Sequence, residues 1–428
     1  MSTARFNEFS KTTKEIWKSQ VLKDLKGKSF EETLVWQSLE GINIQPYYAQ
    51  EDVENLPFHE IQLAQTNKVS VGWQNRPLIK FSSEKTTNTL IINTLQSGAE
   101  AIILDFEDTN LDKIDFIRLL DKIKLSDKPI YFKTPLGNTL LNELHKFVHY
   151  QPKGGIIHDP IAYFLAGKGE TISNSTWENT KKILLQTDTF PLFSGITVES
   201  HIFHNAGATA TQELAFALAS AVTYVDKLSE INVPIDQIAQ KIEFSISIGT
   251  NYFIEIAKLR SLRFLWKKIL DAYQSSAPCQ INGQPSLFYD SALSAHTNML
   301  RATTEAMSAV MGGADSLTVH AYDAIFESDT HAEMGERIAK NVSILLKEES
   351  YLDKVQDPSA GSYYIENLTA ALAQNAWNLF LTIEAKGGIL PAFEEGFIQA
   401  EIEKSYQAKI AAFEADKIMV GVNKFQLK

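Results

Sequence analysis

Four of the nine histidines of this 428-residue chain follow short apolar segments of the kind that form buried strands. These histidines are His158, His201, His204 and His320. Imidazole and carboxylate groups bind divalent metal ions, and a metal-bound water is a nucleophile at neutral pH. A metal-dependent enzyme is therefore one hypothesis. However, no His-x-His pair ends any of these segments, and polar residues also collect at strand ends as helix caps, so we assign no metal site.

The elements that must position these side chains alternate along the chain from about residue 76. Apolar, β-branched runs predict strands at residues 77–81, 101–106, 129–132, 154–158, 193–199, 242–248, 280–287 and 316–320, each followed by a helical stretch. This count favours an α/β fold of the (β/α)8 TIM-type barrel, although an open doubly wound sheet gives a similar pattern. In a barrel, the histidines share the working face at the carboxyl ends of the strands.

One continuous segment, residues 242–268, shows the repeating unit most clearly. The run IEFSISI is short and β-branched and ends at Gly249, which predicts a covered strand. The helix predicted after it carries one apolar stripe at helical spacing, which consists of Phe253, Ile256, Leu259, Leu262 and Leu265. The segment is therefore a β-α unit.

The two ends of the chain differ from the predicted barrel, which we place at residues 61–365. Residues 1–60 predict a short amphipathic helix and then an extended aromatic segment, and together they carry Trp17, Trp36, Tyr47 and Tyr48. So short a piece cannot bury these rings alone, so we expect an N-terminal arm that packs on the main domain or on another subunit. Residues 366–428 predict a C-terminal helical region.

Composition excludes several classes of partner. The formal net charge of −12 disfavours nucleic acid and anionic membranes, which require a basic face. No apolar stretch reaches the roughly 20 residues that span a bilayer, and the N-terminus has no apolar signal core, so we expect a cytoplasmic protein. Cys279 is the only cysteine, which excludes an internal disulfide and a thiolate metal cluster.

An ordered series of motifs extends over nearly the whole chain: DLKG, EGI, NAGATATQELAFALA, GTNYFIEIAKLRSLRFLW, RIAKN, DPSAGSYYIENLT, AWNLF, EAKGG and GVNKF. In this order they resemble the barrel portion of the methylmalonyl-CoA mutase family. The resemblance implies a (β/α)8 barrel that encloses a CoA ester, followed in catalytic chains by a cobalamin-binding domain. This chain stops at Lys428, just after the last motif, so we expect it to bind no cofactor itself.

The chain departs from the family at residues that act on the substrate. The family's active-site tyrosine falls on Leu78, and its Tyr-His pair falls on His201 and Ile202. Isoleucine cannot make the hydrogen bond that the resemblance requires at the thioester carbonyl. Catalytic chains also hold the substrate carboxylate with an arginine, but this chain has none between residues 118 and 260. Gln284 matches a glutamine of the seventh loop and is a candidate residual ligand of the channel.

A second motif falls near the end of the predicted barrel. The segment from Asp329 to Gly335 approximates the Asp-x-His-x-x-Gly of cobalamin-binding domains, with the glycine one position late. Ser328, Asp329 and Thr330 are ordinary N-cap residues for the helical run that follows. We therefore interpret His331 as part of a helix start.

The resemblance and its departures imply the small, non-catalytic subunit of a heterodimeric methylmalonyl-CoA mutase. A large partner subunit would carry adenosylcobalamin and catalyse the radical interconversion of methylmalonyl-CoA and succinyl-CoA. The four aromatic residues of the arm are the interface candidates, and the sequence leaves open whether the isolated chain forms a homodimer.

Two further hypotheses stay open. One is an autonomous barrel enzyme that acts on a CoA ester or through a metal held by the four histidines. The other is an active mutase barrel that docks a separate cobalamin protein, which Leu78 and Ile202 disfavour.

Overall fold

Parallel strand segments form the centre of the molecule. The computed structural model describes residues 12–68, 71–107, 109–169, 171–326 and 333–426. The parallel segments are β3 (Gln74–Asn75), β4 (Leu78–Lys80), β5 (Ile102–Asp105), β6 (Ile130–Lys133), β7 (Gly154–Ile157), β8 (Phe193–Ser194), β9 (Ile196–Glu199), β10 (Ile242–Ile248), β11 (Gln280–Pro285) and β12 (Ser316–Leu317). They form two 5-stranded sheets, ordered β3-β12-β11-β10-β9 and β4-β5-β6-β7-β8.

Two strands are shared between the sheets and close the ring. Only Arg76 and Pro77 separate β3 from β4, and only Gly195 separates β8 from β9. The Arg76 N–H donates to the Leu317 carbonyl of one sheet at 2.9 Å, and the Pro77 carbonyl accepts from the Ile103 N–H of the other at 2.9 Å. β3 with β4, and β8 with β9, are thus two continuous strands, which reduces the segments to a ring of eight. The predicted (β/α)8 barrel is confirmed.

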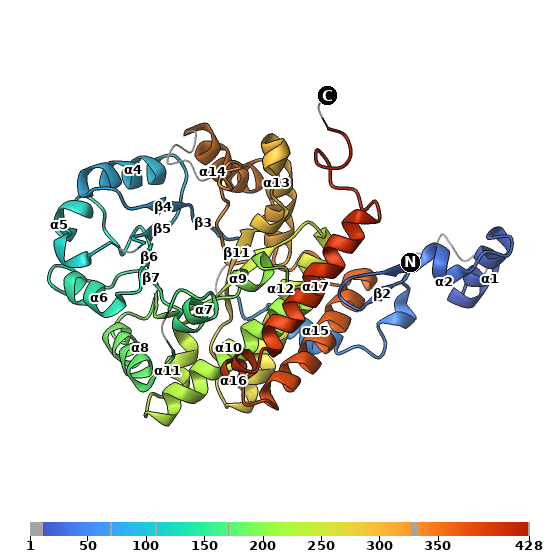
Figure 1. Ribbon diagram of the computed structural model, residues 1–428, viewed down its shortest axis with the longest axis horizontal. Helices are drawn as coiled ribbons and strands as arrows, with labels where there is room; N and C mark the ends of the chain where they lie inside the picture. Colours follow the sequence, from blue (N-terminus) through green and yellow to red (C-terminus); the bar gives the residue numbers. More distant parts are fainter. Residues whose placement is uncertain (1–11, 69–70, 108, 170, 327–332, 427–428) are drawn as a thin grey trace, which may run out of the picture.

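Helices cover the outside of this ring. They are α4 (Glu84–Gln96), α5 (Phe116–Leu119), α6 (Gly137–His145), α7 (Pro160–Leu165), α8 (Asn174–Thr187), α9 (His201–Asn205), α10 (Ala210–Glu230), α11 (Ile235–Gln240), α12 (Tyr252–Ala272), α13 (Ala295–Met311) and α14 (Glu333–Glu348). Figure 1 shows α4, α5, α6 and α8 arranged around β4 to β7. On β10, Ile242, Phe244, Ile246 and Ile248 belong to the main hydrophobic cluster. The alternate residues of β10 therefore face the inside of the ring.

The stripe predicted on α12 is buried except at its first member. Ile256, Leu259, Leu262 and Leu265 are buried in the body. Phe253 is instead 46% exposed, because it lies in the first turn of α12. Its ring contacts Tyr364 at a centroid distance of 5.2 Å.

The predicted C-terminal helical region consists of α15 (Tyr363–Glu384), α16 (Ile389–Glu394) and α17 (Phe397–Glu414). α15 packs on α12, where the Arg260 guanidinium lies 2.9 Å from a carboxylate oxygen of Glu366 and 2.9 Å from one of Asp357. No helix in the described ranges is long and apolar enough to cross a membrane.

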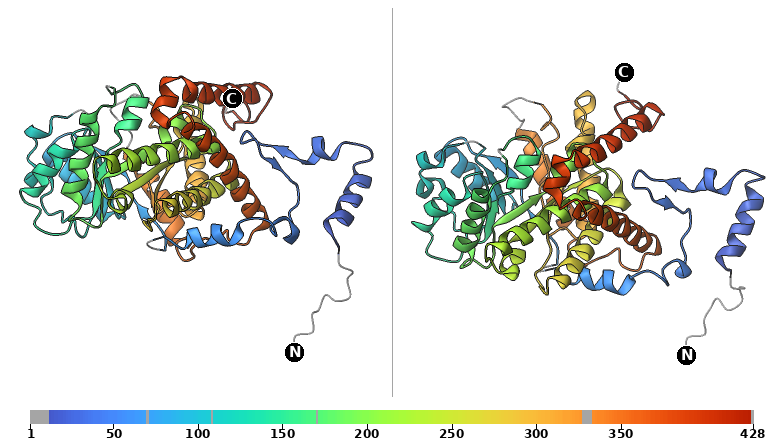
Figure 2. Two further views of the ribbon diagram at one scale, coloured as in Figure 1. Left: turned by 90° about the horizontal axis from the view of Figure 1, so that it is seen from below. Right: turned by 60° about the horizontal axis from the view of Figure 1, so that its bottom comes forward.

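The N-terminal arm leaves the body through a short hairpin. It consists of α1 (Lys14–Asp24), α2 (Phe30–Leu34), β1 (Trp36–Gln37), β2 (Asn43–Ile44) and η1 (Gln50–Asp52), and it leads into α3 (Phe58–Gln65). Figure 2 shows α1 and α2 projecting away from the barrel. No residue of α1, which the structure describes in full, is buried. Ile42 and Ile44 belong to the main hydrophobic cluster, so the hairpin is packed on the body while α1 stands away from it.

Candidate functional site

A chain of side-chain hydrogen bonds crosses the carboxyl end of the barrel. His320, after β12, donates from Nε2 to Gln284 Oε1 on β11 at 3.2 Å. The Gln284 amide donates to Ser245 Oγ on β10 at 2.6 Å, and Ser245 Oγ also lies within hydrogen-bond distance of His201 Nδ1, at 3.2 Å. We define the rim network as Asp105, Lys133, Glu199, His201, Ser245, Gln284 and His320.

The charged end of the rim network surrounds one ammonium group. Lys133 Nζ lies 3.5 Å from Glu199 Oε1 and 3.9 Å from Asp105 Oδ2. The Glu199 carboxylate raises the pKa of Lys133, so the ammonium stays charged. His201 Nε2 is 4.0 Å from the same Glu199 oxygen, and burial lowers the pKa of His201, which keeps its ring neutral. The Lys133 ammonium is thus the positive partner of both carboxylates.

The other two candidate histidines point elsewhere. His158 Nε2 lies 3.1 Å from Thr180 Oγ1 on α8, on the helix side of the strands, and burial lowers the pKa of His158 to about 4. His204 is buried, with Nδ1 3.0 Å from Ser286 Oγ. The structure therefore brings two of the four histidines into the rim network and leaves these two outside it. Within the described ranges, no group of three or more His, Cys, Asp or Glu side chains is placed to hold a metal ion.

The two apolar residues at expected active-site positions lie in different surroundings. Leu78 packs inside the ring against a small cluster that includes Ile103 and Tyr131. Ile202 packs on the main hydrophobic cluster, whereas the neighbouring His201 faces the rim network. Of these two neighbouring residues, His201 therefore lies at the barrel mouth, and Ile202 packs against the core.

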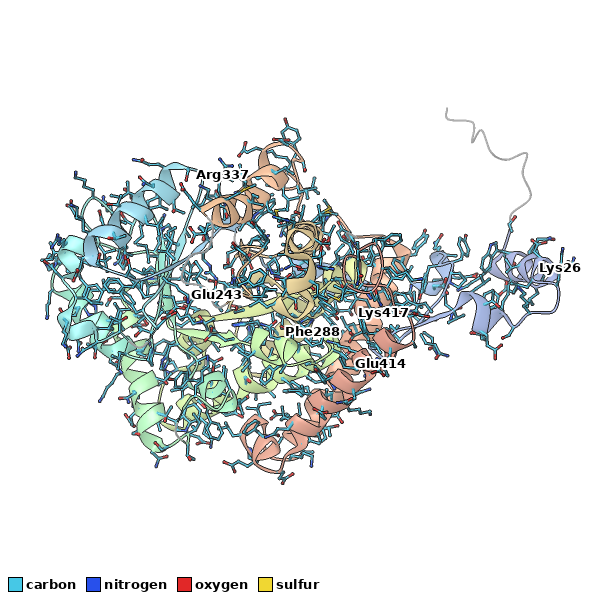
Figure 3. The ribbon with its side chains drawn as sticks, turned by 45° about the horizontal axis from the view of Figure 1, so that its top comes forward. Lys26, Glu243, Phe288, Arg337, Glu414 and Lys417 are labelled. Carbon is cyan, nitrogen blue, oxygen red and sulfur yellow. The ribbon has the colours of Figure 1, made fainter. Side chains whose placement is uncertain are left out.

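A buried ion pair spans the interior of the barrel. Arg76 donates to the two carboxylate oxygens of Glu243 on β10, at 2.9 and 3.1 Å. Its guanidinium carbon lies 3.9 Å from the centre of the Tyr131 ring on β6. β11 and β12 separate β10 from β3, and β5 separates β6 from β4, so these three side chains come from well-separated points of the ring. We call them the axial bar, and Figure 3 shows Glu243 in the middle of the body.

Sequence reasoning missed the axial bar, although one signal for it was present. Glu243 stands within the apolar run IEFSISI, where alternation places it on the same face as Ser245 and Ser247. Barrel interiors are usually filled by branched apolar side chains, so an inward carboxylate requires a cation from another strand. The sequence does not identify that cation, because only the strand order brings Arg76 opposite Glu243.

Behind the rim network, a buried lysine lies between two buried glutamates. Lys258 Nζ on α12 is 2.8 Å from Glu213 Oε2 on α10 and 2.6 Å from Glu255 Oε2. Glu213 Oε1 accepts the N–H of Ser247 on β10 at 2.8 Å. Burial raises the pKa of Glu213 to about 7, against the opposing effect of the Lys258 ammonium. This cluster ties two helices to the strand that carries part of the rim network.

We expect the contribution of Glu213 to stability to be lost as pH rises. Its pKa is about 7 in the folded chain against a usual value of 4.5, so the folded state keeps a proton that the unfolded state releases. The contribution is fully present below about pH 4.5 and disappears as pH rises through about 7. Glu213→Gln should therefore remove a pH dependence on the order of 3 kcal/mol from the free energy of unfolding. Urea unfolding at several pH values measures it, with exposed Glu230→Gln as control, and an unchanged pH slope in Glu213→Gln would contradict the assignment.

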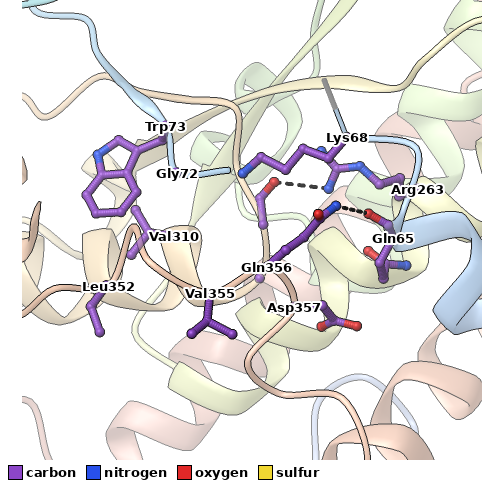
Figure 4. Close-up of a pocket in the computed structure, with 12 residues that line it drawn as sticks. Gln65, Lys68, Gly72, Trp73, Arg263, Val310, Leu352, Val355, Gln356 and Asp357 are labelled. Carbon is purple, nitrogen blue, oxygen red and sulfur yellow. Dashed lines mark hydrogen bonds between the residues drawn. The ribbon is translucent and has the colours of Figure 1, made fainter. Parts of the chain in front are cut away.

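A small pocket lies at the amino end of the barrel (Figure 4). Arg263 donates to the Gly313 carbonyl at 3.0 Å, and Gln356 donates to the Gln65 carbonyl at 2.8 Å, which closes the pocket on two sides. Lys68 also lines it. Its volume of about 10 Å³ has room for about one water molecule, so the pocket is too small for the nucleotide end of a coenzyme.

Known proteins match this chain over most of its length. A family profile described as methylmalonyl-CoA mutase matches residues 146–428. The methylmalonyl-CoA mutase small subunit of Porphyromonas gingivalis is 32% identical over 98% of this chain and 71% of its own length. The methylmalonyl-CoA mutase of Cereibacter sphaeroides is 30% identical over 96% of this chain and 64% of that protein. The methylmalonyl-CoA mutase large subunit of Streptomyces virginiae is 28% identical over 96% of this chain and 62% of that protein.

The chain spans less than two thirds of the length of the second and third of these relatives. The similarity nevertheless covers almost all of this chain, including the barrel strands and the arm. Profile, relatives and strand order agree, and the chain belongs to the methylmalonyl-CoA mutase family.

Proposed function

We propose that the chain is the non-catalytic small subunit of a heterodimeric methylmalonyl-CoA mutase. The axial bar is the observation that carries the proposal. An acyl-CoA enclosed by a barrel needs an open interior for its long pantetheine chain. Here the interior is crossed by Arg76 and Glu243, whose side chains are only 1% and 3% exposed, stacked against Tyr131. The similarity to a protein named as a small subunit supports the same proposal.

The rim network also disfavours the substrate. Methylmalonyl-CoA carries a free carboxylate, and the charged end of the network already holds two carboxylates, Asp105 and Glu199, beside the ammonium of Lys133. The Asp105 and Glu199 carboxylates would repel a third carboxylate at this point, because their side chains are only 12% and 18% exposed and water screens them incompletely. Gln284, the candidate channel ligand, already uses its amide group on Ser245 and His320.

The cofactor belongs, in this proposal, to the large subunit. The mutase family depends on cobalamin. The residues described here do not fit it: from α14 to the end of α17 the described elements are helices, without the parallel strands of a nucleotide-type domain. His331, the sequence candidate for a cobalt ligand, lies outside the described residues. Adenosylcobalamin on the large subunit would supply the radical chemistry.

The arm is the proposed surface for the large subunit. The Trp17 and Tyr47 rings lie 4.9 Å apart, and the Tyr48 and Tyr364 rings lie 5.6 Å apart. In the isolated chain, Trp36 is 49% and Tyr47 is 44% exposed. A pocket of about 350 Å³ opens beside Tyr47, Tyr48 and Tyr364. Half-exposed rings beside an open pocket are typical of surfaces that another protein covers.

Reconstitution with a mutase large subunit tests this function. We expect the purified chain to turn over no methylmalonyl-CoA in the presence of adenosylcobalamin, and to elute with the large subunit as one complex in size-exclusion chromatography. The large subunit should show higher activity or a longer half-life in that complex than alone. Turnover by the chain alone, or separate elution of the two chains at micromolar concentration, would refute the proposal.

A further inference from the structure

The turn of the arm hairpin is bound to the start of a long helix. Ser38 donates its N–H to the Ile42 carbonyl at 3.1 Å and closes the turn, in which Gly41 has a φ of +71°. At the tip of this turn, the Glu40 carboxylate accepts the N–H groups of Ala210 and Thr211, at 3.1 and 2.8 Å. These N–H groups belong to the first turn of α10, where the helix itself provides no acceptor.

A second contact holds the same turn from another side. Asn375 on α15 donates from Nδ2 to the Glu40 carbonyl at 3.0 Å. Glu40 is thus joined to α10 by its side chain and to α15 by its backbone. Beyond this point the hairpin strands are only two residues long, and α1 and α2 stand away from the body. Figure 3 shows Lys26 at the far end of the arm, at a long distance from Glu243 in the barrel.

We propose that Glu40 is the positioning residue that sets the direction of the arm, so that its aromatic rings are held ready for a partner subunit. The inference rests on the proposed function of the arm. A short hairpin has little rigidity of its own, so the direction of α1 and α2 depends on how its turn is fixed. A segment that is held in its bound conformation loses less conformational entropy on binding, and this raises affinity without any new contact.

Glu40→Gln is the direct test, because it removes the charge and one of the two acceptors but keeps the shape. Glu31→Gln is a matched control, since Glu31 is an exposed residue of the same arm. Spin labels attached to Ser19→Cys in α1 and Lys404→Cys in α17 report the distance between the arm and the body, which pulsed electron paramagnetic resonance measures. Cys279 is buried and leaves these two sites as the accessible thiols.

We expect one narrow distance distribution in the parent and in Glu31→Gln, and a distribution at least about twice as wide in Glu40→Gln. Glu40→Asp should restore part of the narrowing, and Asn375→Ala should widen the distribution with Glu40 intact, which keeps the test valid if Glu40→Gln folds poorly. A distribution that stays narrow in both Glu40→Gln and Asn375→Ala would overturn the inference.

Binding to the large subunit separates this inference from the proposed function. We expect Glu40→Gln to weaken that binding about tenfold. An arm that is released, with binding to the large subunit unchanged, would support the positioning role of Glu40 but refute the arm as the interface. An arm that stays fixed, with binding weakened, would refute the positioning role and leave the interface standing.

Discussion

Replacing Arg76 with methionine is expected to lower the free energy of unfolding by about 3–5 kcal/mol. Methionine fills much of the arginine volume but leaves the Glu243 carboxylate buried without a cation. The pair of Lys227 and Glu230 has a similar nitrogen–oxygen distance of 3.0 Å, but it is exposed, so water solvates the charge that remains when its partner is removed. Lys227→Met should therefore change stability by less than about 1 kcal/mol.

The double variant Arg76→Met with Glu243→Leu identifies the cause of the loss. An apolar pair of similar volume removes both charges, so we expect most of the stability to return, to within about 1–2 kcal/mol of the parent. Urea unfolding followed by circular dichroism measures all four proteins. If Arg76→Met is as stable as the parent, or if the double variant is as unstable as the single one, the axial bar is not the ion pair that supports the barrel interior.

Deleting residues 1–35 is expected to weaken binding to the large subunit by roughly 100-fold while the barrel stays folded. The deletion removes α1 and α2 with Trp17, and burial of each large aromatic ring contributes about 2 kcal/mol to such an interface. It retains Glu40, Ile42 and Ile44, which are joined to the body. Deleting residues 1–50 instead would also remove Ile42 and Ile44 from the main hydrophobic cluster. A loss of binding in that variant could then come either from the lost interface or from a damaged core.

Thermal stability and binding of the truncated chain must be measured together. Ile117→Ser is the control for loss of an exposed apolar side chain, because Ile117 is 67% exposed on α5, on the opposite side of the body from the arm. We expect it to change neither quantity. Binding as tight as that of the full chain would exclude the arm as the interface. Unfolding of the truncated barrel would instead identify the arm as a structural cover.

The sequence predicts the barrel well, because each β-α unit carries a local signal. The run IEFSISI before Gly249 and the stripe from Ile256 to Leu265 contain their own periodicity, and the structure has β10 and α12 at these positions. Phe253 departs from the stripe because burial in a first helical turn depends on neighbours, here Tyr364 from a distant segment. Periodicity alone does not report such neighbours.

The candidate site is predicted only in part, for a geometric reason. Histidines that follow strands lie near the same end of the barrel, but one residue of offset decides whether a side chain faces inward or toward a helix. His201 and His320 face the rim network, whereas His158 follows the inward Ile157 and faces α8. The pairing of Arg76 with Glu243 depends on which strands meet across the ring, which is a property of the closed fold.

The axial bar also limits how the sequence can change during evolution. Removing either charge alone destabilises a fold whose total stability is typically about 5–15 kcal/mol, whereas removing both is nearly neutral. A lineage that changes one codon at a time must therefore pass through a poorly folded intermediate to lose the pair of Arg76 and Glu243. Selection for folding alone is therefore expected to keep both residues of the pair, whatever the barrel interior is used for.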